Sequence, residues 1–363
     1  MPSVPSVISV VKDIKFLIIG PAWVGDMVLA QSLFRLLKQR HPDARLDVVA
    51  PAWTLPLLAR MPEVDEAIPL PFKHGELALG ARWRLGRGLR ARDYDRAIVL
   101  PNSFKSALVP CAARARRRTG FVGELRYGLL NDARRLDKTE LPRTVDRFVA
   151  LGIESGEALP EIPQPWLEAD ADSARAALVR LGRGLPKTPV LGLCPGAEYG
   201  PAKRWPAEYF ADVARTKLAE GWEVWLFGSD QDAPVTLAIQ SLTQGGCLDL
   251  GGKTALAEAI DLMSLTTAVV TNDSGLMHVA AALGRRVVAI YGSSDPGHTP
   301  PLSDKATMRY LGLSCSPCFQ RECPLGHLRC LRDIAPGLVL ESLSEASGKM
   351  PEKRAKDKEK REG

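Results

Sequence analysis

Three loops of the sequence combine glycines and charged side chains that could bind an anion or move a proton. The first loop, residues 20–26 (GPAWVGD), follows a short apolar run and ends on a carboxylate. Two glycines before a helix can expose backbone amides to phosphate, but this loop matches neither a GxGxxG motif nor a P-loop. Asp26 would repel phosphate, so we interpret it either as the N-cap of the next helix or as a base that accepts a proton from an attacking hydroxyl.

The second loop, residues 195–206 (PGAEYGPAKRWP), places Lys203 and Arg204 just before an expected helix. Cations at the start of a helix oppose the helix dipole, which favours anions there. This placement is reasonable if the two side chains bind an anion such as a diphosphate. The alternative is that they are two solvated surface charges.

The third loop, residues 270–278 (VTNDSGLMH), joins an apolar strand to a helix with an apolar face. Ser274 and Gly275 would offer free backbone N–H groups at the helix start, which is a typical anion site. Taken alone, Asp273 could be a helix cap and His278 a buried side chain that is simply hydrogen-bonded. Together with the loop that contains Lys203, the third loop favours a phosphate-binding site.

Parallel sheets are the elements expected to position these loops. Apolar runs separated by segments of helical periodicity predict strands at residues 15–19, 46–50, 97–100, 190–194, 223–227, 248–250, 268–271 and 287–291. This alternation predicts two α/β domains with parallel sheets that face each other across a cleft. We predict an N-terminal domain at 1–160, a linker rich in proline and glycine at 161–188, a C-terminal domain at 189–345 and a flexible charged tail at 346–363.

The composition excludes several classes of protein. The chain has 363 residues, of which 45% are hydrophobic and 25% charged, as in ordinary globular proteins. It has no apolar stretch of transmembrane length and its N-terminus lacks the basic start of a secretory signal, which predicts a cytoplasmic location. The net charge is +6, and arginines cluster near residues 82–96 and 114–118. A basic surface can bind nucleic acid, an anionic membrane or an acidic substrate, and the lack of regularly alternating aromatic residues disfavours nucleic acid.

Six segments, in order, resemble the ADP-heptose:lipopolysaccharide heptosyltransferases of glycosyltransferase family 9. Besides the three loops, they are residues 120–132 (GFVGELRYGLLND), 227–232 (FGSDQD) and 250–260 (LGGKTALAEAI). The resemblance extends from about Lys15 to Arg332 and is greatest with the heptosyltransferase II branch of the family. It implies a GT-B fold of two Rossmann-like domains, with the acceptor on the N-terminal domain and the ADP-sugar on the C-terminal one.

The resemblance also implies a reaction, an inverting transfer of L-glycero-D-manno-heptose from ADP-heptose to the first heptose of the lipopolysaccharide inner core. By position, Asp26 matches the catalytic base of the family and Lys203 its diphosphate-binding lysine. The residues that match or lie near other donor contacts are Asp273, Ser274, Gly275, His278, Glu198, Tyr199, Asp230 and Thr254. The alternatives are a heptosyltransferase I that acts on Kdo-lipid A, a sugar-nucleotide epimerase of the same fold, and a basic binding protein without catalysis.

Further expectations concern cofactors and the acceptor. Because Lys203 and helix amides could hold the charge of the departing ADP, we expect no obligatory metal ion or other cofactor. We expect Arg114, Arg116 and Arg117 to bind acidic groups of the acceptor, with the protein peripheral on the cytoplasmic face of the inner membrane. The cysteine-rich segment could form a small zinc site, a redox pair or a set of reduced thiols. Its cysteines are Cys315, Cys318, Cys323 and Cys330.

Overall fold

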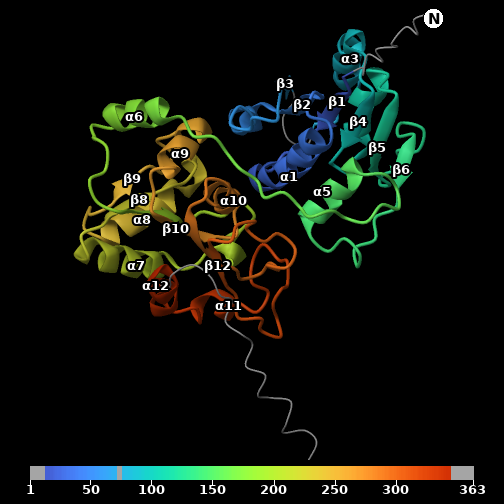
Figure 1. Ribbon diagram of the computed structural model, residues 1–363. Coiled ribbons are helices and arrows are strands. Elements are labelled where there is room, and N and C mark those ends of the chain that lie inside the picture. The colour runs from blue at the N-terminus through green and yellow to red at the C-terminus, as the bar shows by residue number, and fades with distance from the viewer. Residues whose placement is uncertain (1–12, 72–75, 345–363) are drawn as a thin grey trace, which may run out of the picture. The chain divides into compact units, whose positions relative to one another are not determined.

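The computed structural model describes residues 13–71 and 76–344, which form two compact units divided between Pro163 and Gln164 (Figure 1). The N-terminal segment 1–12 and the predicted charged tail 346–363 lie outside the described residues. No helix in the described ranges is both long and apolar enough to cross a bilayer.

The first unit is built on a parallel sheet with the strand order β3-β2-β1-β4-β5-β6. The strands are β1 (Lys15–Ile19), β2 (Arg45–Pro51), β3 (Glu66–Leu70), β4 (Arg96–Val99), β5 (Arg117–Phe121) and β6 (Asp132–Arg134). Its α-helices are α1 (Val24–Arg40), α2 (Leu55–Leu58), α3 (Leu79–Gly88), α4 (Leu108–Ala112) and α5 (Thr144–Gly152), with 3-10 turns η1 (Ala52–Thr54), η2 (Arg90–Arg92) and η3 (Phe104–Ala107). Helix α1 packs on α5, where a Cβ at Gly152 would collide with Leu33, so glycine permits the close approach.

The second unit repeats this plan, with the strand order β12-β11-β10-β7-β8-β9, again all parallel. The strands are β7 (Val190–Cys194), β8 (Glu223–Leu226), β9 (Leu248–Asp249), β10 (Ala268–Asn272), β11 (Arg286–Ile290) and β12 (Ala306–Arg309). Its α-helices are α6 (Ala171–Arg180), α7 (Ala207–Ala219), α8 (Ala233–Leu242), α9 (Leu256–Met263), α10 (Gly275–Ala282), α11 (Arg329–Arg332) and α12 (Pro336–Ser344), with 3-10 turns η4 (Pro201–Lys203) and η5 (Asp230–Asp232). Its core contains the fully buried Trp205 and Phe210.

The segment expected to be a linker differs from the prediction. Most of residues 161–188 belong to the second unit and contain α6, which packs on α9. The Asp170 side chain caps α6 by accepting hydrogen bonds from the N–H groups of Asp172 and Ser173. The prolines and glycines that suggested a linker flank this alanine-rich helix and do not interrupt it.

The two sheets share the same topology, and each has one switch point. Chain order reverses between β1 and β4 in the first sheet and between β7 and β10 in the second. Ligands of doubly wound α/β units bind outside the carboxyl ends of the strands at such a point. The architecture confirms the predicted α/β class with two Rossmann-like parallel sheets. Ligand sites are therefore expected in the loops that follow β1, β4, β7 and β10.

Candidate functional site

The switch point of the second sheet holds a compact ionic cluster. Lys203 lies on η4, after β7, and its Nζ is 2.5 Å from Oδ2 of Asp273, the residue that follows β10. Ser294, in the loop after β11, donates its Oγ hydrogen to the same Asp273 oxygen over 2.5 Å. The side chain of Asp273 is 6% exposed and that of Lys203 is 19% exposed, so part of the lysine side chain reaches solvent. The cluster therefore presents a held cation at the edge where ligands bind.

The loop after β10 shows that the alternative interpretation of Asp273 as a helix cap is wrong. Helix α10 begins at Gly275 with Ser274 as its N-cap, and in the described structure the Ser274 side chain makes no capping hydrogen bond. Asp273 instead uses its carboxylate for Lys203 and Ser294, while its backbone N–H bonds to Ile290 O. The first turn of α10 thus keeps backbone donors that an anion could accept from.

His278 lies on α10, one turn from its start, and is buried. Burial lowers the pKa of its imidazole to about 4; nearby Asp273 opposes this shift and Lys203 adds to it. The side chain is therefore neutral near pH 7 and can make hydrogen bonds without adding charge to the cluster.

The cysteine-rich segment braces the loop that contains Lys203. The Tyr199 hydroxyl donates to Phe319 O over 2.6 Å, and the N–H of Ala202 donates to Arg321 O over 3.0 Å. The Tyr199 ring lies 5.1 Å from Lys203 Nζ and 5.4 Å from the Arg321 guanidinium carbon, so two cations adjoin one ring. Residues 319–321 therefore help to fix the site.

Asn272 and Ser294 are site residues that sequence reasoning missed. The Asn272 amide donates to Pro195 O over 2.7 Å, and its oxygen accepts from Trp205 N over 3.0 Å. It thereby fastens both ends of the Lys203 loop to the end of β10. Asn272 adjoins Asp273 in sequence, which could have identified it. Ser294 lies in an unremarkable loop and carries no sequence signal that we can identify.

The other predicted donor residues are more dispersed. Asp230, on η5, lies against the backbone of Gly252, whose N–H bonds to Gly228 O, so the loops bearing Asp230 and Thr254 are neighbours after β8 and β9. Glu198 is exposed. Within the described ranges these three side chains form no hydrogen bond or ion pair with Lys203 or Asp273, so the structure does not bring them into the ionic cluster.

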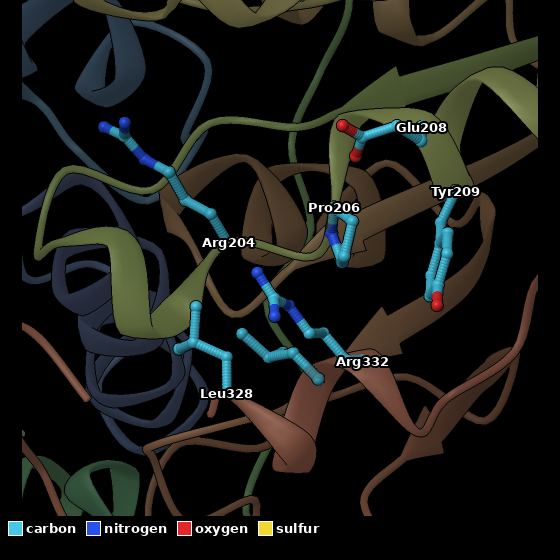
Figure 2. A pocket seen from close by; sticks show the side chains of 7 residues that line it. Arg204, Pro206, Glu208, Tyr209, Leu328 and Arg332 are labelled. Carbon is cyan, nitrogen blue, oxygen red and sulfur yellow. The ribbon is translucent and has the colours of Figure 1, made fainter. Parts of the chain in front are cut away.

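A pocket of about 470 Å³ adjoins the Lys203 loop at the start of α7 (Figure 2). Figure 2 shows Arg332 reaching toward Pro206, whereas the Arg204 guanidinium extends away from it. The lining residues are Arg204, Pro206, Glu208, Tyr209, Leu328, Leu331 and Arg332. None of the predicted donor residues lines this pocket, so it is distinct from the ionic cluster.

Asp26 occupies the corresponding position in the first unit, after β1 at its switch point. Helix α1 begins at Val24 with Trp23 as its N-cap, so the half-buried Asp26 is in the first turn and is not the cap. The loop before it is fixed where Trp53 Nε1 donates to Ala22 O over 2.9 Å. A carboxylate in the first turn is favoured by the helix dipole. The cap interpretation of Asp26 is wrong, and a role as a base stays a prediction.

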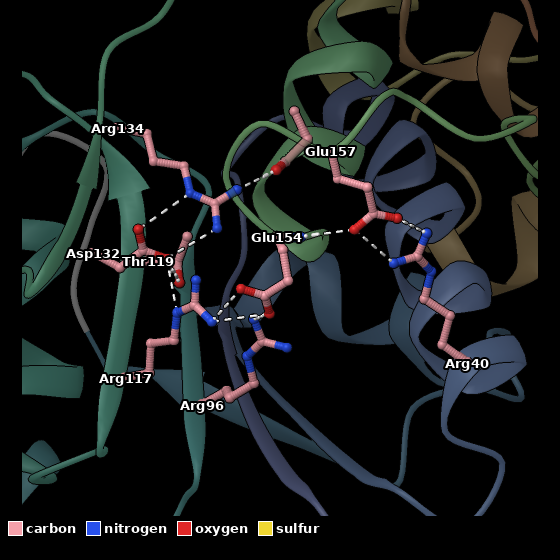
Figure 3. Close-up of polar contacts among 9 residues, drawn as sticks. Arg40, Arg96, Arg117, Thr119, Asp132, Arg134, Glu154 and Glu157 are labelled. Carbon is pink, nitrogen blue, oxygen red and sulfur yellow. Dashed lines mark hydrogen bonds and ion pairs between the residues drawn. The ribbon is translucent and has the colours of Figure 1, made fainter.

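The arginines predicted to bind the acceptor lie elsewhere. Arg117 is the first residue of β5 and pairs with Asp132 and Glu154, as Figure 3 shows, and Arg116 pairs with Asp93 and Asp95. This is the amino-terminal edge of the parallel sheet, opposite the edge that Asp26 follows. The structure does not bring Arg114, Arg116 and Arg117 together with Asp26, and the last two are largely neutralised by partners remote in sequence.

A zinc site receives no support. Within the described ranges, no three His, Cys, Asp or Glu side chains are placed to hold one metal ion, and the cysteines of residues 315–330 are free thiols. Cys330 is buried, which raises its pKa, whereas backbone amides of residues 325–328 lower the pKa of Cys323.

Two Rossmann-like units of identical topology, one with a lysine held at its switch point, have the architecture of GT-B enzymes. The profile of glycosyltransferase family 9 (heptosyltransferase) matches residues 82–329. The chain belongs to this family. It is 50% identical over 338 residues to lipopolysaccharide heptosyltransferase 2 of Salmonella typhimurium, covering 91% of this chain and 97% of the relative. The Escherichia coli protein of the same name is 48% identical over 91% of this chain and 97% of its own. The structure of E. coli ADP-heptose lps heptosyltransferase II superposes with a TM-score of 0.81 at 46% identity, covering 91% of this chain and 97% of that one.

Proposed function

We propose that this glycosyltransferase moves L-glycero-D-manno-heptose from ADP-heptose to the first heptose of the lipopolysaccharide inner core, with inversion at the anomeric carbon. The proposal rests on similarity to proteins named lipopolysaccharide heptosyltransferase 2, which are 48–50% identical to this chain and align with 91% of it. The ionic cluster at the second switch point supports it, because an ADP-sugar donor requires a site for a diphosphate.

We assign the donor to the second unit. Lys203 would exchange part of its contact with Asp273 for the diphosphate, and the backbone N–H groups at Ser274 and Gly275 would donate hydrogen bonds to the remaining phosphate oxygens. His278, being neutral, would orient a hydroxyl or phosphate oxygen by hydrogen bonding. These groups would stabilise the charge that develops on ADP as the bond to the anomeric carbon breaks.

We assign the acceptor and the base to the first unit. The Asp26 carboxylate would accept the proton of the attacking acceptor hydroxyl as its oxygen bonds to the anomeric carbon. Attack from the side opposite the leaving ADP inverts that carbon. The proton resides on Asp26 at the end of the step and ADP leaves with the bonding electrons. We assign no step to a metal or other cofactor. We further propose that the enzyme is cytoplasmic and peripheral at the inner membrane, where a lipid-linked acceptor lies.

The test is ADP release from ADP-heptose with and without a core acceptor that ends in one heptose. We expect acceptor-dependent release by the wild type and a loss of about 100-fold or more in Asp26→Asn, which keeps the shape and removes the base. Asp43→Asn, on the exposed surface of the same unit, is the matched control and should retain activity.

Three outcomes would change the proposal. Release only with the heptose-free Kdo-lipid A acceptor would assign the chain to the first heptosyl transfer. Turnover of the donor without any acceptor would indicate an epimerase or a hydrolase. No release by folded protein with either acceptor would refute the proposed donor or the enzymatic reading as a whole.

A further inference from the structure

We propose that a rim of exposed apolar side chains on the first unit docks the protein onto an anionic lipid bilayer. The inference rests on the proposed function, because that function requires an acceptor anchored in lipid. The rim, which we call the apolar rim, consists of Leu77, Leu79, Trp83, Leu125 and Tyr127. The exposed fractions of their side chains run from 40% for Trp83 to 83% for Leu125. A group of large apolar residues this exposed is typical of a surface that binds another molecule.

The apolar rim lies at the same edge of the sheet as Asp26. Helix α3 begins shortly after the carboxyl end of β3, and Leu125 and Tyr127 follow the carboxyl end of β5. Two hydrogen bonds link these parts through the η3 turn. Lys105 Nζ donates to Glu76 O over 3.2 Å, and Phe104 N donates to Glu124 Oε2 over 2.7 Å. The apolar side chains therefore belong to one continuous border.

Helix α3 turns its apolar side outward. Leu79 and Trp83 are one helical turn apart, and both are exposed. The opposite side, with Gly86, packs against α4, where an added Cβ would collide with Val109 O. The inner face of the helix is thus packed within the unit, whereas Leu79 and Trp83 are not part of its buried core cluster.

Leu125 is held outward by a strained loop on a rigid base. Glu124 and Leu125 have φ values of +43° and +54°, a conformation that non-glycine residues rarely adopt. The adjacent Arg126 is 1% exposed, and its guanidinium donates to Phe121 O and Pro101 O, tying the loops after β4 and β5 together. Such strain persists only where the surroundings enforce it, and it is concentrated at functional sites. Here it projects an apolar side chain into solvent.

The charge around the apolar rim matches an anionic bilayer. Helix α3 carries arginines next to and one turn after Trp83, at Arg84 and Arg87, and no acidic residue. Arg84 and Arg87 are exposed beside Trp83, and neither forms an ion pair with the residues that the structure describes. Tryptophan and leucine flanked by arginine are typical of helices that lie in the membrane interface, where the rings enter the headgroup layer and the cations meet lipid phosphates. A soluble protein partner would not require this combination.

The test is sedimentation with vesicles of phosphatidylcholine alone or with phosphatidylglycerol added. We expect the wild type to sediment with the anionic vesicles and much less with the neutral ones. Trp83→Ser with Leu125→Ser, and separately Arg84→Glu with Arg87→Glu, should each weaken binding to anionic vesicles by about tenfold or more. Trp83→Phe should retain binding. The matched control, Val179→Ser with Leu237→Ser, removes equally exposed apolar residues from the second unit and should change nothing.

Activity on two acceptors separates this proposal from the proposed function. The rim variants should turn over a water-soluble, deacylated heptose acceptor at the wild-type rate and lose activity only on the same acceptor anchored in vesicles. Wild-type protein that uses the soluble acceptor but ignores anionic vesicles would overturn the docking proposal and leave the enzyme assignment intact. Equal binding by wild type and both rim variants would also overturn it. So would concentration-dependent dimerisation that the rim variants abolish, because the rim would then be a protein interface.

Discussion

The hydrogen bond from Ser294 to Asp273 provides a measurable test of how the ionic cluster is held. The bond joins a hydroxyl to a carboxylate over 2.5 Å, and both residues are buried. A hydrogen bond to a charged group contributes about 1.5–3 kcal/mol, so Ser294→Ala should lower the free energy of unfolding by about that amount. Asp273 would keep Lys203 as its partner, which makes a larger loss unexpected.

The neighbouring serine is an unusually close control for this variant. Ser293 is also buried, but its Oγ has no hydrogen-bond partner in the described structure. Removing an unsatisfied hydroxyl is nearly neutral or stabilising, so Ser293→Ala should change the free energy of unfolding by less than about 1 kcal/mol. Both substitutions delete one oxygen from the same buried loop, and the difference between them isolates the bond to Asp273.

Urea unfolding, with hydrogen exchange of the β10 and β11 amides to report on the second unit, measures both variants. A second measurement is the KM for ADP-heptose. If Asp273 orients Lys203 toward the donor, Ser294→Ala should raise that KM by about tenfold, equivalent to about 1.4 kcal/mol, and leave the acceptor KM unchanged. Equal stability losses in the two variants, or an unchanged donor KM in a destabilised Ser294→Ala, would refute the positioning role.

Three further predictions follow from the pKa shifts, the ion pairs and the expected lack of a metal. The pKa of His278 falls from 6.5 to about 4 on folding because the imidazole is buried, so the unfolded state binds more protons between these two pH values. The urea midpoint should therefore fall as the pH drops from about 6.5 to 4. The variant His278→Gln should lose that part of the pH dependence of the midpoint. Glu154→Gln should lower the free energy of unfolding by less than about 1 kcal/mol, although it removes the ion pairs with Arg96 and Arg117, because the Glu154 side chain is largely exposed. A decrease of more than about 2 kcal/mol in urea unfolding would contradict this expectation. Activity should survive extensive dialysis against EDTA, and loss restored specifically by a divalent ion would show that a metal takes part.

The regular core of the fold could be predicted from sequence because its signals are local. The predicted strand at 15–19 matches β1, and that at 190–194 matches β7. The unpredicted strands are β3, β5, β6 and β12, and all lie at or next to a sheet edge. Such strands are only partly buried, and β5 begins with two arginines and contains a glycine, so none shows a continuous apolar run.

Residues of the candidate site could be predicted only where the sequence pattern that identifies them lies within one loop. Lys203 and Asp273 could be singled out separately from their loops, but their direct contact spans 70 residues of sequence. The acceptor-binding role expected for Arg114, Arg116 and Arg117 stays a prediction, but the ion pairs of Arg116 and Arg117 could not be predicted from sequence for the same reason. Arg117 shares with Arg96 the carboxylate of Glu154, which is 37 residues away from Arg117 in sequence, so part of a cluster that looks basic in sequence is ion-paired in space. Side-chain pairing of this kind depends on the fold and leaves no local pattern.

The contacts from Phe319 and Arg321 to the Lys203 loop have a consequence for biosynthesis. The bond from Tyr199 to Phe319 closes a loop of 120 residues, so the ribosome must release nearly the entire chain before the loop can settle. A nascent chain can complete the first unit and even β7 to β10 while its donor loop still lacks its brace. Early termination or proteolytic trimming ahead of residue 319 would therefore remove this brace together with Leu331, Ile334 and Val339 of the second unit's core, and the product would lack both a complete core and an ordered donor loop. The timing of synthesis itself thus keeps the donor site of an incomplete enzyme from maturing.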